Sequence, residues 1–233
     1  MVEKYRDYIE NISKKTGFIG STLEKVERLI RILEWMNSDE KLNKLLALKG
    51  GTAINTAVFN FPRLSVDIDL DLTENLSKEE MIKERDTIHN LLVNYLNSNN
   101  YKINMEKSKN VYALDSIVAE YIDIKGNIDN IKIEINYMNR VHILETKKIN
   151  VSTDVFKDKH LTIHCIHPIE IYAAKLCALL SRTTARDLYD VYTLSKYDLF
   201  DKEEKQLLKQ CFMLEYIAVN DLSLIHISEP TRH

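Results

Sequence analysis

The stretch RLSVDIDLDL at residues 63–72 places three aspartates, Asp67, Asp69 and Asp71, at every second position among aliphatic residues. Alternate side chains of a β-strand point to opposite faces of a sheet, so the stretch predicts a strand over residues 64–72 with one apolar and one acidic face. Carboxylates two residues apart lie roughly 7 Å apart along the strand and repel each other unless a cation joins them. The pattern therefore predicts a site for a divalent cation with oxygen ligands, Mg²⁺ or Mn²⁺.

The acidic strand pattern also fits two other kinds of structure. The acidic face can be the solvated side of an amphipathic edge strand, and the strand alone leaves that alternative open. A calcium-binding loop also begins with aspartates at alternate positions, but it needs a glycine where Leu72 stands and a glutamate where Lys78 stands. The calcium loop is therefore excluded.

The segment LKGGTAIN at residues 48–55 lies upstream of the acidic strand and precedes a short apolar stretch that predicts a helix. Gly50 and Gly51 let the backbone approach a ligand, and the free N–H groups at a helix start favour phosphate oxygens. Thr52 can add a hydroxyl. A plain helix start without phosphate remains an alternative for this short segment.

A further carboxylate stands in NIKIEINYM at residues 130–138, where isoleucines alternate with polar residues. Glu134 lies on the polar face of this predicted strand. If the strand neighbours the one that carries Asp67, Glu134 completes a carboxylate triad. A glutamate that only faces solvent is the alternative.

The order of predicted elements indicates an α+β fold with a mixed β-sheet core flanked by helices and followed by a C-terminal helical bundle. We expect N-terminal helices that pack on the core (1–45), a core (46–166), a C-terminal helical region (167–221) and a tail (222–233). The tail, LSLIHISEPTRH, resembles the translation of a sequencing-library adapter, so we expect it to be foreign and the helical region to be truncated. Ser77 and Glu80 predict a capping box at the start of a long amphipathic helix.

Composition narrows the class of protein further. The net charge is −3 and the pI about 6.2, which gives no sign of a general nucleic-acid coat. Three widely spaced cysteines in apolar surroundings indicate reduced core thiols. No apolar run has the length of a membrane span or a signal peptide, so we expect a cytoplasmic protein without a membrane partner.

Two longer strings carry a family resemblance: LKGGTAINTAVFNFPRLSVDIDLDL at residues 48–72 and HPIEIYAAKLCALLSRTTARDLYDVYTL at residues 167–194. The order of two glycines, a helix and an Asp-x-Asp motif resembles the signature of the nucleotidyltransferase fold of the DNA polymerase β superfamily. The two strings together resemble the AbiEii/AbiGii toxin family, which includes MenT-like toxins of type IV toxin–antitoxin systems. The resemblance implies a nucleotidyltransferase-type sheet core.

The resemblance also implies roles for individual residues. The nucleotide would be held by a glycine turn and its surroundings, namely Lys49, Gly50, Gly51, Thr52 and Ser65. The catalytic residues would be Asp67, Asp69, Glu134, Lys175 and Asp190, with the metal on Asp67, Asp69 and, less firmly, Glu134. Read from the residues alone, Lys175, Arg182 and Arg186 can add positive charge near a triphosphate. Thr184 and Asp187 fit a helix cap, and Arg186 and Asp190 fit an i,i+4 ion pair.

These observations predict an Mg²⁺- or Mn²⁺-dependent enzyme that transfers a nucleoside monophosphate from an NTP to an acceptor. The resemblance implies that the acceptor is RNA, at the 3′ end of tRNA, that the protein acts as a toxin in a toxin–antitoxin or phage abortive-infection system, and that a cognate antitoxin is its partner. Lysines 102, 107 and 109 can touch phosphates but fit ordinary solvated residues equally well. The alternatives are a small-molecule nucleotidyltransferase of the aminoglycoside-modifying type and a catalytically silent nucleotide-binding module.

Overall fold

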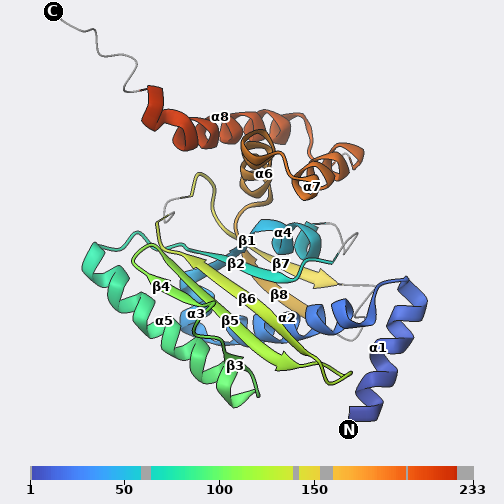
Figure 1. Ribbon diagram of the computed structural model, residues 1–233. Helices are drawn as coiled ribbons and strands as arrows, with labels where there is room; N and C mark the ends of the chain where they lie inside the picture. The colour runs from blue at the N-terminus through green and yellow to red at the C-terminus, as the bar shows by residue number, and fades with distance from the viewer. Residues whose placement is uncertain (1, 59–63, 139–141, 153–159, 198, 225–233) are drawn as a thin grey trace, which may run out of the picture. The chain divides into compact units, whose positions relative to one another are not determined.

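The computed structural model describes residues 2–58, 64–138, 142–152, 160–197 and 199–224 (Figure 1). The chain divides into two compact units. The first unit spans residues 1–142 and 146–166, and the second comprises residues 143–145 and the chain from His167 onward. None of the described helices is long and apolar enough to span a membrane.

The first unit contains a mixed sheet whose strand order, among the described residues, is β3-β5-β6-β2-β1-β8-β7, with β4 paired to β5. The strands are β1 (Leu46–Lys49), β2 (Asp67–Leu72), β3 (Lys102–Ile103), β4 (Lys109–Val111), β5 (Leu114–Ile122), β6 (Ile128–Asn136), β7 (Lys147–Ser152) and β8 (His160–Cys165). Strand β2 lies near the middle, antiparallel to β1 and parallel to β6. The strand that carries Glu134 is therefore a direct neighbour of the strand that carries Asp67, which the sequence had left open.

The helices of the first unit are α1 (Val2–Thr16), α2 (Gly20–Ser38), α3 (Glu40–Leu45), α4 (Gly50–Ala53), which continues into the π-helix η1 (Ile54–Val58), and α5 (Lys78–Ser98). The predicted capping box starts α5: the Ser77 hydroxyl accepts from the Glu80 amide, and the Glu80 carboxylate accepts from the Ser77 amide. The apolar residues of β2 and β6, among them Ile68, Leu70 and Ile133, are buried on one face of the sheet. Helices α2 and α5 supply the buried side chains that complete this core, and the Trp35 and Tyr95 rings stack between the two helices with centroids 3.8 Å apart.

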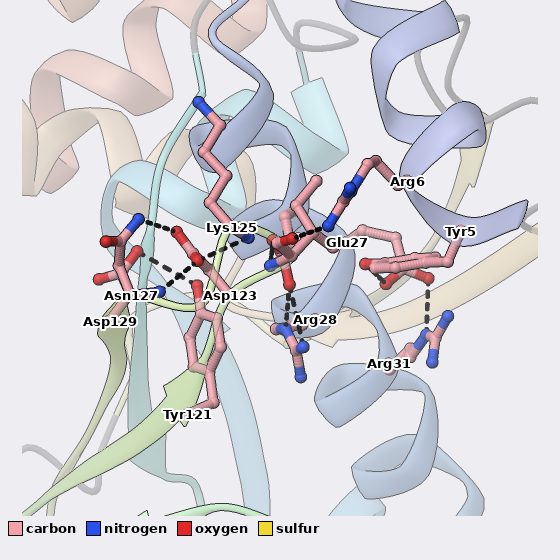
Figure 2. Close-up of polar contacts among 12 residues, drawn as sticks. Tyr5, Arg6, Glu27, Arg28, Arg31, Tyr121, Asp123, Lys125, Asn127 and Asp129 are labelled. Atoms are coloured by element: carbon pink, nitrogen blue, oxygen red, sulfur yellow. Dashed lines mark hydrogen bonds and ion pairs between the residues drawn. The ribbon is translucent and has the colours of Figure 1, made fainter. Parts of the chain in front are cut away.

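Hydrogen bonds attach the N-terminal helices to the hairpin between β5 and β6 (Figure 2). The fully buried Glu24 carboxylate accepts from Arg28 at 2.9 Å and from the Ile124 amide at 2.9 Å. Arg6 donates to the Ile124 carbonyl at 2.8 Å. The ion pairs of Glu24 with Arg28 and of Glu27 with Arg31, at 2.9 and 2.6 Å, lie within α2 and neutralise its buried carboxylates. The hydrogen bonds to Ile124 join the helices to the hairpin.

The turn between β5 and β6 is held by hydrogen bonds to Asp123. Asp123 accepts from the amides of Lys125 and Asn127, both at 2.8 Å, and Gly126 adopts a φ of 86°. The Asp123 pKa is lowered; burial alone would raise it, and the hydrogen bonds from the turn outweigh that effect. The turn residues 125–127 thus join β5 to β6, and this connection fixes the register between these two strands.

A histidine–aspartate pair lies between α5 and β5. His89 Nδ1 is 2.8 Å from Asp115 Oδ2, and the Asp115 side chain is fully buried. This hydrogen bond raises the His89 pKa against the opposing effect of partial burial, while Asp86 and Arg85 act on it more weakly and in opposite directions. A buried carboxylate therefore depends on a partner whose charge changes near neutral pH.

We expect His89→Gln to lower the free energy of unfolding by about 1–3 kcal/mol at pH near 6. Because the folded-state pKa of His89 is raised, its contribution is fully present below the unfolded-state value, about 6.5, and is lost as the pH rises through the folded-state pKa. Urea unfolding of both proteins across this range measures the difference. A difference that is constant with pH, or that grows as the pH rises, would contradict the assignment.

The second unit contains α6 (Pro168–Arg182), α7 (Ala185–Lys196) and α8 (Lys202–Leu224), with α6 packed against the other two. Pro168 occupies the first helical position of α6, as expected, and Thr184 caps α7 through the Asp187 amide. Helix α8 continues to Leu224, three residues beyond the boundary expected at 221. The rest of the expected tail, residues 225–233, lies outside the described residues. All three cysteines are buried free thiols.

Candidate active site

The acidic face of β2 carries the first half of the candidate site. Asp67, Asp69 and Asp71 all lie on the sheet face opposite the core, because Ile68 and Leu70 between them are buried. Strand β2 begins at Asp67 and not at residue 64, so Ser65 lies just before the strand, half-buried, and not within it. The observed strand is therefore shorter at its start than the predicted one. The predicted alternation of apolar and acidic side chains is confirmed.

The register of the sheet lines up three further polar residues with Asp69. Lys49 of β1 is directly opposite Asp69, and Glu134 of β6 is its partner on the other side. Ser116 of β5 is in turn opposite Glu134. Residues in register on neighbouring strands project from the same face, so a row of polar side chains crosses four strands at this level.

Asp69 is the electrostatically strained member of this row. Its pKa is raised to about 6, first by burial and then by the carboxylates of Asp67 and Glu134, while Lys49 and Lys132 oppose the shift. Three negative groups are thus close enough to disfavour each other's charge. Such an excess of negative charge is what a bound divalent cation relieves.

Asp71 has a different role from the other two aspartates. Its side chain is 2% exposed, and the Lys49 ammonium lies 2.5 Å from its Oδ1. The ion pair neutralises a buried charge and links β1 to β2. The three aspartates therefore divide into a structural ion pair at Asp71 and a charged pair at Asp67 and Asp69, and the predicted contact of Lys49 with nucleotide would have to compete with Asp71.

Glu134 forms an ion pair with Lys132, two residues away on the same strand face, at 2.8 Å. Across the described ranges, no group of three or more histidine, cysteine, aspartate or glutamate side chains is gathered so that it could hold a metal ion. The structure therefore does not show Asp67, Asp69 and Glu134 as a preformed three-carboxylate site. Glu134 as a third metal ligand stays a prediction.

The glycine turn lies directly against Asp69. Gly50, the first residue after β1, has a φ of 69°, a left-handed conformation that favours glycine. A Cβ atom built on Gly50 would lie 2.5 Å from Asp69 Oδ2. The first amides of α4, at Gly50 and Gly51, precede the first intrahelical hydrogen-bond donors, so helix geometry leaves them available to a ligand.

We expect Gly50→Ala to reduce catalysis at least about a hundredfold, because the new methyl group displaces the Asp69 carboxylate by an ångström or more. Gly126→Ala is the matched control, since Gly126 also has a positive φ, 86°, but has nothing within 4 Å of an added Cβ. Both variants should lose stability from backbone strain, and only Gly50→Ala should lose activity. Equal activities of the two variants would show that the contact with Asp69 is unimportant.

Thr52 does not offer its hydroxyl to a phosphate as expected. The side chain is fully buried, and its hydroxyl donates to the backbone carbonyl of Asp67. This hydrogen bond fixes the start of α4 to the start of β2. The prediction of Thr52 as a nucleotide ligand through its hydroxyl is thus corrected to a structural role, which burial in a helix start could not reveal from sequence.

The second unit gathers its own charged cluster around two buried aspartates. The Lys175 ammonium of α6 lies 2.8 Å from Asp187 Oδ1 and 3.1 Å from Asp190 Oδ2 of α7. Arg182 donates to both oxygens of Asp187, at 2.7 and 3.1 Å, and Thr184 donates to one of them at 2.7 Å. These donors hold the Asp187 pKa well below its usual range even though burial pushes it upward.

This cluster changes the assignments made from spacing alone. The cation paired with Asp190 is Lys175, and the exposed Arg186 takes no part in the cluster, so the expected i,i+4 pair of Arg186 and Asp190 is wrong. Asp187, expected as a helix cap, also binds Lys175 and Arg182. The catalytic role of Lys175 and Asp190 and the nucleotide contacts of Arg182 and Arg186 stay predictions.

Sequence reasoning missed three contributors: Ser116 in the row of Asp69, Lys132 in register with Asp67, and Asp187 as the centre of the second cluster. Lys132 could have been found, because it stands two residues before Glu134 on the same strand face. Asp187 and Asp190, three apart on one helix, also share a face. Ser116 gave no signal, since its place depends on the pairing of β5 with β6.

A parallel β2–β6 pair beside an antiparallel β1, with two aspartates on β2 and a glycine turn against them, defines a nucleotidyltransferase-type fold and site. A family model described as nucleotidyl transferase AbiEii toxin, type IV toxin–antitoxin system, matches residues 31–231. The chain therefore belongs to the AbiEii family, which makes it a nucleotidyltransferase enzyme of the toxin class.

Solved structures agree with this fold. The nucleotidyltransferase toxin MenT4 from Mycobacterium tuberculosis H37Rv is similar with a TM-score of 0.65 and 14% identity, over 93% of this chain and 72% of that one. JHP933 from Helicobacter pylori is similar with a TM-score of 0.53 and 19% identity, over 84% of this chain and 81% of that one. A search of curated protein sequences gives no match.

Proposed function

We propose that this nucleotidyltransferase uses Mg²⁺ or Mn²⁺, held by Asp67 and Asp69, to transfer a nucleoside monophosphate from an NTP to an RNA acceptor, the 3′ end of tRNA. The observation that supports the metal is the raised pKa of Asp69, which comes from burial and from the neighbouring carboxylates. Mg²⁺ commonly binds one or two carboxylates and completes its shell with phosphate oxygens and water. Two aspartates without a third protein ligand fit that mode.

The chain's own residues would act on the nucleotide as follows. The amides of Gly50 and Gly51 donate to oxygens of the triphosphate, which they can approach because glycine has no side chain. Asp67 and Asp69 would hold the cation; when bound, it supplies charge to polarise the α-phosphate and to neutralise the leaving pyrophosphate. The positive charge of Lys132, on the same sheet face, would add to this stabilisation.

In the reaction, the acceptor hydroxyl oxygen forms a bond to the α-phosphorus, and the bond from the α-phosphorus to the β-phosphate oxygen breaks to release pyrophosphate. The proton of the hydroxyl needs a base on the same face. Glu134 supports this role because it is in register with Asp69 and about a third exposed, with Asp69 as the alternative. By its family, the chain would act as a toxin controlled by a cognate antitoxin protein.

The test is incubation of the protein with each NTP, labelled at the α-phosphate, together with Mg²⁺ and total tRNA. We expect label in the RNA from one or more NTPs, lost when EDTA removes the metal and restored by Mg²⁺ or Mn²⁺. Label that appears only on an aminoglycoside or another small molecule would favour the small-molecule alternative. NTP binding without transfer to any acceptor would favour a silent module.

A further inference from the structure

Helix α7 buries all of its negative charge. Its two acidic residues, Asp187 and Asp190, are each 1% exposed and face the Lys175 ammonium. Every residue of α7 is described, and no acidic side chain of the helix is exposed. The solvent side of α7 is therefore more positive than the sequence of the helix suggests.

The exposed side of α7 carries two cations, two tyrosine rings and a leucine, which together we call the outer face: Arg186, Leu188, Tyr189, Tyr192 and Lys196. Leu188 is 59% exposed, Tyr189 42% and Tyr192 55%. Large exposed aromatic groups on one helix face are a feature of binding surfaces. The Lys196 ammonium lies 4.6 Å from the Tyr192 ring centroid, so a cation and a ring already lie together there.

The chemistry of this face matches unpaired nucleic acid. Tyrosine rings offer surfaces on which bases stack, and arginine and lysine contact the phosphates. Tyr189 and Tyr192 are three residues apart, which makes them neighbours on the helix surface, about 5–6 Å apart at Cβ. A polyanion meets only positive charge on the outer face, because the two aspartates are turned inward.

We propose that the outer face of α7 binds an unpaired stretch of the RNA acceptor, with Tyr189 and Tyr192 stacking on bases and with Arg186 and Lys196 contacting phosphates. The inference rests on the proposed function, since it gives that reaction's acceptor a docking surface. It adds a place of recognition that neither the catalytic aspartates nor the glycine turn provides.

The test measures binding of total tRNA and of an unstructured RNA oligonucleotide by fluorescence anisotropy at several salt concentrations. The variant Tyr189→Ala/Tyr192→Ala should raise the Kd for both RNAs at least about tenfold. Arg186→Ala should weaken binding and reduce the salt slope by about one. The matched control is Leu214→Ala/Ile217→Ala, which removes exposed apolar side chains from α8 and should leave the Kd unchanged.

Circular dichroism checks folding, and Tyr189→Leu/Tyr192→Leu, which keeps the apolar bulk but removes the rings, should weaken RNA binding in a folded protein. An unchanged Kd in both tyrosine variants overturns the inference. So does loss of a co-purifying antitoxin with RNA binding intact, which would make the outer face a protein interface. If wild type binds RNA through these tyrosines but transfers no nucleotide, the inference stands and the proposed function fails.

Discussion

The variant Asp69→Asn should lose at least about a thousandfold in kcat/KM for nucleotidyl transfer while becoming more stable than the wild-type protein without metal. The activity falls because asparagine removes one of two negative charges proposed to hold the cation. The stability rises because a buried carboxylate beside Asp67 and Glu134 is replaced by a neutral side chain of nearly equal shape. Opposite changes in activity and stability separate a catalytic role from a folding role.

The sign of the stability change follows from the pKa of Asp69. Its folded-state value, about 6, lies above the ordinary value near 4, so the folded protein binds this proton more tightly than the unfolded chain. Its stabilising contribution is present below the unfolded-state value and is lost as the pH rises through about 6. At neutral pH, Asp69→Asn should therefore gain about 1–3 kcal/mol, and the gain should disappear near pH 4.

The measurement combines steady-state transfer with urea unfolding in EDTA at several pH values. Asp67→Asn should lose activity to a similar extent. Asp71→Asn, on the same strand face, should instead lower the stability, because it leaves Lys49 without its buried partner. Wild-type transfer rates in Asp67→Asn or Asp69→Asn would remove the two-carboxylate mechanism.

The second large effect is expected at Lys175, where Lys175→Met should lower the free energy of unfolding by about 3–5 kcal/mol. The lysine side chain is 11% exposed and neutralises two carboxylates that are almost fully buried. Its removal takes a positive charge away from each of these two buried carboxylates. Lys209→Met, which changes an exposed lysine on α8, should have little effect and serves as the control.

A double-mutant cycle tests the cause of this loss. If the lost attraction between Lys175 and Asp190 is responsible, Lys175→Met should cost much less in an Asp190→Asn background. Additive losses would show that the lysine acts through packing and not through charge. The variant Lys175→Arg keeps the positive charge, and the specific activity of its folded fraction then tests the proposed catalytic role. Retained folding together with a raised KM for NTP supports that role.

Local rules were enough to predict much of the first unit. The period of two predicted the acidic face of residues 64–72 and the polar face of residues 130–138, and the spacing of Ser77 and Glu80 predicted the start of α5. The sequence left open whether these two strands pair with each other. In the structure they do, with Asp69 in register beside Glu134. These features depend on backbone geometry that a single segment already contains.

The features that sequence could not predict all depend on contacts between distant segments. The Lys49–Asp71 pair needs the antiparallel pairing of β1 with β2, and the hydrogen bond of Thr52 needs the helix start to lie against β2. The local i,i+4 rule suggested Arg186 for Asp190, but the packing of α6 on α7 places Lys175 there. Burial makes that pair stronger than any surface pair along one helix.

The central claim is that Asp67 and Asp69, beside the Gly50 turn, support transfer of a nucleoside monophosphate. The most direct measurement supplies the same NTP labelled either at the α-phosphate or at the γ-phosphate, with Mg²⁺ and RNA, to the wild-type protein. The account predicts that the α-label enters the RNA and that the γ-label leaves as pyrophosphate. Entry of the γ-label into the acceptor would contradict it, as would α-labelling by Asp69→Asn at the wild-type rate.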